Sequence, residues 1–313
     1  MHLAVDGAGG LWLTGGSMNN AISRRRFIAT SAIAGAGLGA PRWLLMPASA
    51  ATASVEFGVC TQLKKAAQLK QAGFQYVEEN VASVLVPKAT DEEFGGKLAE
   101  IKAAPLPIRS CTGFLPRELK VVGPDVVLEP VLRHVEIVCR RAQQAGIGRI
   151  VFGSGASRQV PDGFDRAKAK AQLTDFCRQA APIAGKHDVI IVLENLNKGE
   201  CNFINRVDEA LEIVNAVAHP NFLLHADIYH MMREDEGPES IIKGGTKLRH
   251  CHVAEKVKRT APGVAGDDFR PYFKALKAIG YAGGISIEGR WDKNFDEQLA
   301  KARSVLAEQF QSA

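Results

Sequence analysis

The 313-residue sequence has no cysteine pair at metal-ligand spacing and no block of basic residues long enough to suggest a nucleic-acid or membrane-surface contact. Its cysteines stand singly, mostly inside apolar runs, which favours buried free thiols over a thiolate metal site or a disulfide. The formal net charge is +5, and residues 1–50 contribute +3 of it, so the remainder carries only +2. We therefore expect no nucleic-acid partner. The six cysteines are at positions 60, 111, 139, 177, 201 and 251.

The first fifty residues also lack an apolar run long enough to cross a membrane. Their Ala/Gly-rich stretch is interrupted by Pro41 and Arg42, whereas a membrane-spanning helix needs about 20 apolar residues in succession. No stable membrane anchoring is expected from such a segment. An amphipathic or anchoring helix is the alternative interpretation.

The same stretch matches an export signal instead. SRRRF, starting at Ser23, fits the twin-arginine pattern, and PASA, ending at Ala50, is typical of a cleavage site. Translation starting at Met18 would give the signal its usual short polar segment before the arginines. We predict that residues 1–50 engage the twin-arginine export machinery and are removed, so that the folded remainder, residues 51–313, reaches the periplasm.

A glycine-rich phosphate loop is missing after the first expected strand, where FGVCTQLKK stands. This absence argues against a doubly wound dinucleotide-binding sheet. Continuous β-branched runs alternate with amphipathic stretches such as 129–146 and 208–218, which indicates parallel strands buried on both faces. Eight such repeats predict a single (β/α)8 barrel over residues 51–313. The expected strands are 55–61, 74–80, 106–112, 149–155, 189–195, 221–227, 248–254 and 283–289.

Ionisable residues end each of the last four expected strands. In such a barrel the active site lies at the carboxyl ends of the strands. Carboxylates that close together would repel one another strongly without a cation. A single His or Glu at such a position is more often a salt-bridged or capping group than a metal ligand. The prediction of a metal site therefore depends on the recurrence across four strands. The residues are Glu194, Asp227 with His230, His250 with His252, and Glu288.

The types of ligand favour certain ions, and position on the strand favours one of the two histidines. A set of carboxylates with one imidazole suits Mn²⁺, Mg²⁺ or Co²⁺ better than a metal bound by thiolates. His252 is preferred to His250 as the ligand because it lies nearer the end of the strand. Glu78 and Glu79 end the second strand, and one of them is expected to point into the barrel, in an ion pair or against the substrate.

Four motifs in this order, ENLNKGE, DIYHMM, HCHVAE followed by PG, and ISIEG, resemble the xylose isomerase-like barrels. That group includes ketose 3-epimerases, sugar phosphate isomerase/epimerase proteins and hydroxypyruvate isomerases. The resemblance covers residues 55–310 and implies a metal held by a Glu, an Asp, a His and a Glu after strands 5 to 8. Mn²⁺ is the expected ion, with Mg²⁺, Co²⁺ and Zn²⁺ as alternatives. The implied ligands are Glu194, Asp227, His252 and Glu288.

The resemblance also implies substrate contacts. Glu200 stands six residues after the first ligand and His230 three residues after the Asp ligand, as in the family. The family has an Arg six residues after the His ligand, but this segment is one residue longer, so the position falls on Lys258 or Arg259. Arg259 is preferred because a guanidinium binds two oxygens at once. Trp291 departs from the family pattern and is expected either to stack on a sugar or to pack in the core.

The resemblance implies a metal-dependent sugar isomerase/epimerase that removes a proton beside a ketose carbonyl. A metal stabilises the enediolate that forms, and Glu194 and Glu288 would serve as base and acid on two faces. Export favours a free ketose or keto-sugar over a sugar phosphate. A keto-glycoside lyase shares the first step and stays an alternative, as does a metal-binding barrel that binds sugar without turnover.

Apurinic endonucleases share the barrel but use extra histidines after strands 2 and 3. Those strands here end in EEN and SCT, so a nuclease is not expected. Homo-oligomers are common in the family, and a homo-oligomer is therefore one expected form of this chain.

Overall fold

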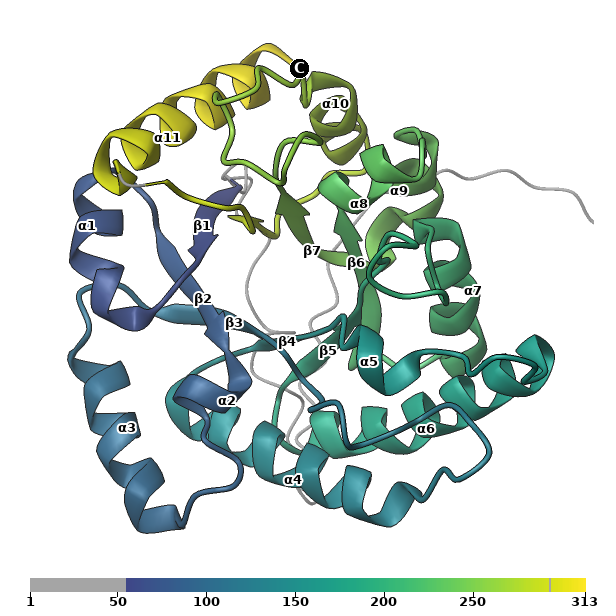
Figure 1. Ribbon diagram of the computed structural model, residues 1–313. Coiled ribbons are helices and arrows are strands. Elements are labelled where there is room, and N and C mark those ends of the chain that lie inside the picture. The colour runs from purple at the N-terminus through teal and green to yellow at the C-terminus, as the bar shows by residue number, and fades with distance from the viewer. Residues whose placement is uncertain (1–54, 293) are drawn as a thin grey trace, which may run out of the picture. The chain divides into compact units, whose positions relative to one another are not determined.

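The computed structural model describes residues 55–292 and 294–313, and the predicted signal over residues 1–50 lies outside them. Eight parallel strands form a closed barrel in sequence order, which confirms the predicted (β/α)8 fold (Figure 1). Each strand falls within its expected range. The strands are β1 (Glu56–Cys60), β2 (Tyr76–Asn80), β3 (Ile108–Thr112), β4 (Arg149–Phe152), β5 (Ile190–Leu193), β6 (Phe222–Asp227), β7 (Leu248–Val253) and β8 (Gly284–Ile287).

Helices surround the barrel and connect its strands (Figure 1). Among the described residues, no helix combines the length and apolar character needed to cross a bilayer. The α-helices are α1 (Ala66–Gln71), α2 (Val81–Val84), α3 (Asp91–Ala103), α4 (Leu128–Ala145), α5 (Gly155–Arg158), α6 (Arg166–Lys186), α7 (Val207–Val217), α8 (Ile228–Arg233), α9 (Glu239–Gly244), α10 (Arg270–Ala278) and α11 (Phe295–Ser312). The 3-10 helices are η2 (Leu63–Lys65) and η3 (Gly245–Lys247).

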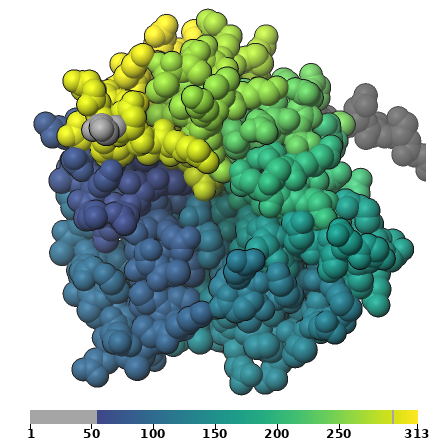
Figure 2. Space-filling model, viewed as in Figure 1, coloured from purple at the N-terminus to yellow at the C-terminus, as the bar shows by residue number. Residues whose placement is uncertain are grey.

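Local sequence explains where these helices start and stop. Thr90 and Glu93 form a capping box at the start of α3: the Thr90 hydroxyl accepts from the Glu93 N–H at 3.2 Å, and Glu93 Oε2 accepts from the Thr90 N–H at 2.7 Å. Helix α4 ends at Gly146, whose φ of 73° is left-handed and suits glycine. Pairing of β8 with β1 closes the barrel, and the first and last described segments adjoin in the space-filling view (Figure 2).

The outward faces of the strands build the apolar core. Strand residues alternate between the two faces, and side chains such as Ile150, Leu193 and Ile285 are fully buried in the hydrophobic cluster beneath the helices. The six cysteines are free thiols, and all but the partly exposed Cys60 are buried, as expected.

The inward faces carry polar side chains. We define the inner column as the inward-facing residues Tyr76, Glu78, Ser110, His225, His250, His252 and Ser286, all fully buried. The Tyr76 hydroxyl is 2.8 Å from Ser286 Oγ across the barrel. A Cβ atom on Gly58 or Gly284 would overlap the Tyr76 ring, so glycine is needed at both positions to admit it.

Candidate metal and substrate site

The four predicted metal ligands meet at the mouth of the barrel. One ligand atom from each of Glu194, Asp227, His252 and Glu288 lies within 4.8 Å of the others. His252 Nδ1 is 3.0 Å from Glu288 Oε2, 3.4 Å from Glu194 Oε1 and 3.9 Å from Asp227 Oδ2. The carboxyl ends of β5 to β8 therefore place three carboxylates around one imidazole nitrogen.

This cluster fits a divalent cation. Glu194 Oε1 and His252 Nδ1 are buried, and neither has a hydrogen-bond partner, which is uncommon for buried polar atoms. Burial raises the pKa of Glu194; the His252 contact opposes the rise, and the neighbouring Glu288 carboxylate adds to it. Three oxygen donors and one nitrogen donor suit Mn²⁺, Mg²⁺ or a similar ion. The types of donor and their separation therefore fit such an ion.

Arg259 brings the positive charge to this cluster. Its Nη2 is 2.6 Å from Glu288 Oε2 and 3.4 Å from Asp227 Oδ2, and its Nη1 is 3.1 Å from Glu200 Oε1. Burial would raise the pKa of Glu288, but the neighbouring His252 and Arg259 lower it to about 2. Glu288 is therefore ionised at neutral pH.

Glu78 supports His252 from inside the barrel. Its Oε1 accepts from His252 Nε2 at 3.0 Å, and its Oε2 accepts from His250 Nε2 at 2.6 Å and from Ser286 Oγ at 2.5 Å. His225 packs its ring against that of His252, with ring centres 4.2 Å apart. When Nε2 of His252 carries the proton, Nδ1 keeps the lone pair that binds a metal. A carboxylate behind a metal-binding histidine orients the ring in this way.

Two asparagines position Asp227 and His230: Asn195 holds the Asp227 backbone, and Asn197 holds the His230 ring. Asn195 Oδ1 accepts from the Asp227 N–H at 3.0 Å, and Asp227 Oδ1 caps α8 by accepting from the His230 N–H at 3.2 Å. His230 Nδ1 accepts from the backbone N–H of Asn197 at 3.1 Å. Its Nε2 therefore carries the proton, and this atom lies 3.5 Å from Asp227 Oδ2 and 3.9 Å from Glu200 Oε2.

The sequence did not point to Arg158 or Gly153, which position Glu194. Fully buried Arg158 donates to the carbonyl oxygens of Gly153 and Glu194, both at 2.7 Å. A Cβ atom on Gly153 would overlap Glu194 Oε2. Gly153, at the end of RIVFG just after β4, could have indicated this arrangement. A glycine at the barrel mouth has no side chain and therefore leaves room for that of a neighbouring residue.

The loop after β7 separates the two candidate cations. Lys258 and Arg259 both have left-handed φ angles, of 57° and 55°, and this turn leaves Lys258 exposed while Arg259 reaches the carboxylates. The loop is held by fully buried Glu255, which accepts from the Gly263 N–H at 2.7 Å and from the Thr260 hydroxyl at 2.8 Å.

Trp291 lies outside the set of site contacts. Its ring packs edge-on against Phe295, with centres 5.0 Å apart, and it is half-buried against the core. The packing expected for Trp291 is present, and its stacking on a sugar stays a prediction.

The sequence is similar to a known protein family and to characterised epimerases. Residues 66–309 match the family model described as xylose isomerase-like TIM barrel. The L-ribulose 3-epimerase of Mesorhizobium japonicum is 27% identical over 249 residues, covering 76% of this chain and 79% of that protein. That of Methylomonas sp. (strain DH-1) is 33% identical over 137 residues, covering 44% of this chain. The chain thus matches only about half (48%) of the length of this second relative.

Solved structures share the fold. A D-allulose 3-epimerase from Methylomonas sp., in complex with D-allulose, superposes with a TM-score of 0.71 at 21% identity, covering 82% of this chain and 97% of that chain. A 3-keto-D-glucoside 4-epimerase from E. coli gives a TM-score of 0.68 at 21% identity, covering 83% and 100%. Since the family model matches nearly the whole barrel, this chain belongs to the xylose isomerase-like TIM barrel family.

Proposed function

We propose that this protein is a divalent-metal-dependent sugar isomerase/epimerase that removes a proton beside the carbonyl of a ketose or keto-sugar. The observation that supports this proposal most strongly is the convergence of four side chains on one point: Glu194, Asp227, His252 and Glu288. Relatives named as ketose 3-epimerases and hydroxypyruvate isomerases support the reaction class. Mn²⁺ is the proposed ion, with Mg²⁺, Co²⁺ and Zn²⁺ as alternatives.

Glu194 and Glu288 are the proposed acid and base. They follow β5 and β8, the two ends of the arc that holds Asp227 and His252, so they approach the site from different sides. One carboxylate takes the α-proton and the other returns a proton to the substrate carbon. Return to the opposite face of the same carbon gives an epimer. Return to the neighbouring carbon, with transfer of a proton from the hydroxyl oxygen to the former carbonyl oxygen, gives an isomer. A bound divalent ion supplies electrostatic stabilisation of the negative charge that develops on the substrate oxygen.

The remaining residues bind and orient the sugar. The Nε2 proton of His230 is placed to donate to a substrate oxygen, and Glu200 accepts from a hydroxyl. Arg259, which contacts Glu200, Asp227 and Glu288, offers a planar fork of donors. Together they hold the reacting carbon between the two catalytic carboxylates.

A keto-glycoside is the second candidate substrate, and a lyase would share the same first step. A 3-dehydro-D-guloside 4-epimerase of E. coli is 28% identical over 124 residues, 39% of this chain and 46% of that protein. The proposed twin-arginine signal favours non-phosphorylated sugars, because it would place the folded enzyme in the periplasm. A non-catalytic sugar-binding barrel is the alternative that the next experiment addresses.

Proton exchange tests the proposal. The protein from residue 51 is incubated with Mn²⁺ in D₂O with a panel of ketoses and 3-keto-glucosides, and deuterium incorporation is read by NMR. Metal-dependent incorporation beside the carbonyl is expected, and the product distinguishes epimerase, isomerase and lyase. Bound metal with no exchange on any sugar would favour the non-catalytic barrel.

A further inference from the structure

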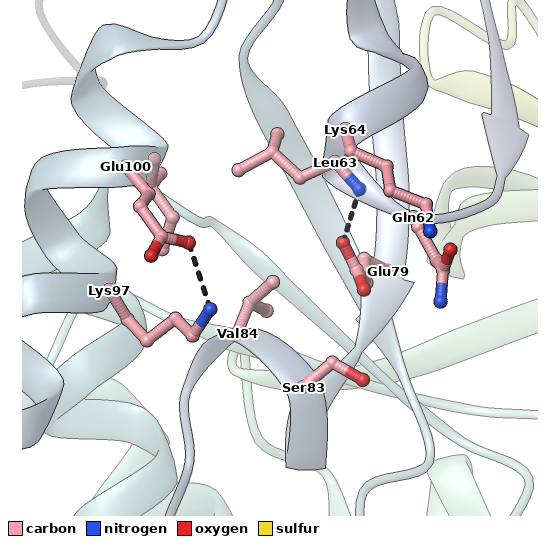
Figure 3. A pocket seen from close by; sticks show the side chains of 9 residues that line it. Gln62, Leu63, Lys64, Glu79, Ser83, Val84, Lys97 and Glu100 are labelled. Atoms are coloured by element: carbon pink, nitrogen blue, oxygen red, sulfur yellow. Dashed lines mark hydrogen bonds and ion pairs between the residues drawn. The ribbon is translucent and has the colours of Figure 1, made fainter.

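A second cavity adjoins the mouth of the barrel. The mouth cavity has a volume of about 380 Å³ and is bordered by Cys60 and Glu288. A neighbouring cavity of about 380 Å³, which we call the side groove, lies between η2, α2 and α3 (Figure 3). Gln62, Glu79 and Ser83 line both cavities. A ligand bound beside Glu288 can therefore extend into the side groove past these three residues.

The side groove combines apolar and polar surfaces. Leu63, Val84 and Ile101 provide apolar surface, while Gln62 and Ser83 are exposed polar groups at its edge. A sugar ring likewise has apolar C–H faces and a rim of hydroxyl groups. The lining therefore matches a sugar ring better than an alkyl chain or an aromatic group, which would need continuous apolar walls.

The charges of the side groove balance. Lys64 and Lys97 stand against Glu79 and Glu100, and Lys97 Nζ is 2.8 Å from Glu100 Oε2 (Figure 3). A phosphate or carboxylate group would need an excess of donors and positive charge. The occupant is thus expected to be neutral.

The residues that border both cavities are well anchored. Glu79 Oε2 accepts from the backbone N–H of Leu63 at 2.5 Å (Figure 3), so β2 holds the loop that carries Gln62. Adjacent residues of β2 face opposite ways: Glu78 supports His252 in the inner column, while Glu79 lines the side groove. One strand thus contributes to both the metal site and the groove.

We infer that the side groove is a second sugar subsite, so that the substrate is a neutral glycoside or oligosaccharide rather than a single monosaccharide. The reacting ring would lie at Glu194 and Glu288, and the next ring would lie between Leu63 and Lys97. This inference rests on the proposed function for the identity of the reacting site.

Matched substrates test the subsite. Proton exchange with Mn²⁺ is compared for methyl 3-keto-glucosides and for 3-keto-cellobiose and 3-keto-maltose, which share the reacting ring but carry a second one. We expect kcat/KM to be about ten-fold higher for at least one disaccharide, corresponding to about 1.4 kcal/mol of additional binding. Lys97→Trp should fill the groove and remove that preference while leaving the methyl glucosides unaffected. Ala99→Trp, on the exposed side of α3, is the control and should retain the preference.

Direct binding separates this inference from the proposed function. Calorimetric titration with cellobiose, maltose and the methyl glucosides needs no turnover. If no substrate exchanges protons but a disaccharide binds more tightly than its methyl glucoside, and Lys97→Trp abolishes the difference, the subsite stands and the catalytic proposal fails. Equal kcat/KM and equal affinity for the disaccharides and the methyl glucosides would overturn the subsite. So would an equal loss of the disaccharide preference in Lys97→Trp and Ala99→Trp.

Discussion

The outward and inward faces of the same eight strands differ sharply in chemistry. Ile150, Leu193 and Ile285 face outward into the apolar cluster under the helices, whereas Glu78, His250 and the rest of the inner column face one another across the barrel. The outer face contributes stability through burial of apolar area. The inner face continues to Glu194 and Glu288 at the barrel mouth, and its polar, ionisable side chains are those of a functional site.

The difference also appears in hydrogen bonding. Buried side-chain atoms without a partner include atoms of the inner column and of the mouth residues above it. Such atoms cost stability, and proteins tolerate them mainly where function needs them. The inner face therefore loses stability next to the candidate metal site. The residues of the inner column and the mouth are Glu194, His225, His230, His250 and His252, and the other such atoms are Arg141 Nε, Arg149 Nε and Trp291 Nε1.

The largest expected effect comes from the two proposed catalytic carboxylates. Glu194→Gln and Glu288→Gln each remove a proton acceptor and a metal ligand while keeping the side chain's shape. Proton exchange at saturating Mn²⁺ should fall by about 10² to 10⁴ in each. Glu212→Gln, an exposed change on α7, should leave the exchange rate unchanged. A Glu194 or Glu288 variant that exchanges as fast as this control would exclude that residue from catalysis.

Neighbouring residues of β2 sharpen the comparison of the two faces. Glu78→Gln removes an acceptor from the group that orients His252, so Mn²⁺ affinity should fall by about 10- to 100-fold. Glu79→Gln changes the adjacent residue, which lines the side groove, and should leave Mn²⁺ affinity unaltered. Calorimetric titration of both variants, with circular dichroism to verify folding, makes the comparison. Equal affinities would mean that Glu78 serves only the barrel's structure.

The loop after β7 offers a second matched pair. Arg259→Lys replaces a planar fork of donors by a point charge, and losing one charged hydrogen bond should raise KM by about ten-fold. Lys258→Ala removes an exposed side chain and should leave KM unchanged. Steady-state kinetics decide, and a larger effect at Lys258 would assign the substrate contact to that residue instead.

The smallest effect is expected on the outer face. Ile150→Val removes one buried methyl group under the helices, which should lower the free energy of unfolding by about 0.5 to 1.5 kcal/mol. Mn²⁺ affinity should not change, because Ile150 faces away from the inner column. Chemical denaturation of this variant measures the loss of stability, and metal titration measures the Mn²⁺ affinity. A loss of affinity in Ile150→Val would contradict the separation of roles between the two faces.

Much of this architecture could be predicted from the sequence because burial leaves a periodic trace. Apolar runs located all eight strands, and polar residues at the ends of the last four located the cluster around His252. Partners across the barrel leave no such trace. The contacts of Glu78 with His250 and His252 depend on how β2 faces β7, strands that are far apart in sequence.

Backbone conformation explains the remaining gaps. Spacing could not choose between Lys258 and Arg259, because two successive left-handed residues decide which side chain enters the site. The support that Arg158 gives to the Glu194 carbonyl was likewise invisible, since an arginine in a helical segment ordinarily predicts an exposed side chain.

The proposed function requires a metal held by Glu194, Asp227, His252 and Glu288. Calorimetric titration of the metal-depleted protein with Mn²⁺, beside a folded Asp227→Asn variant, tests it. We predict that the unaltered protein binds one Mn²⁺ per chain and that Asp227→Asn loses this binding. Absence of binding in the unaltered protein, or equal binding in both, would contradict the central claim.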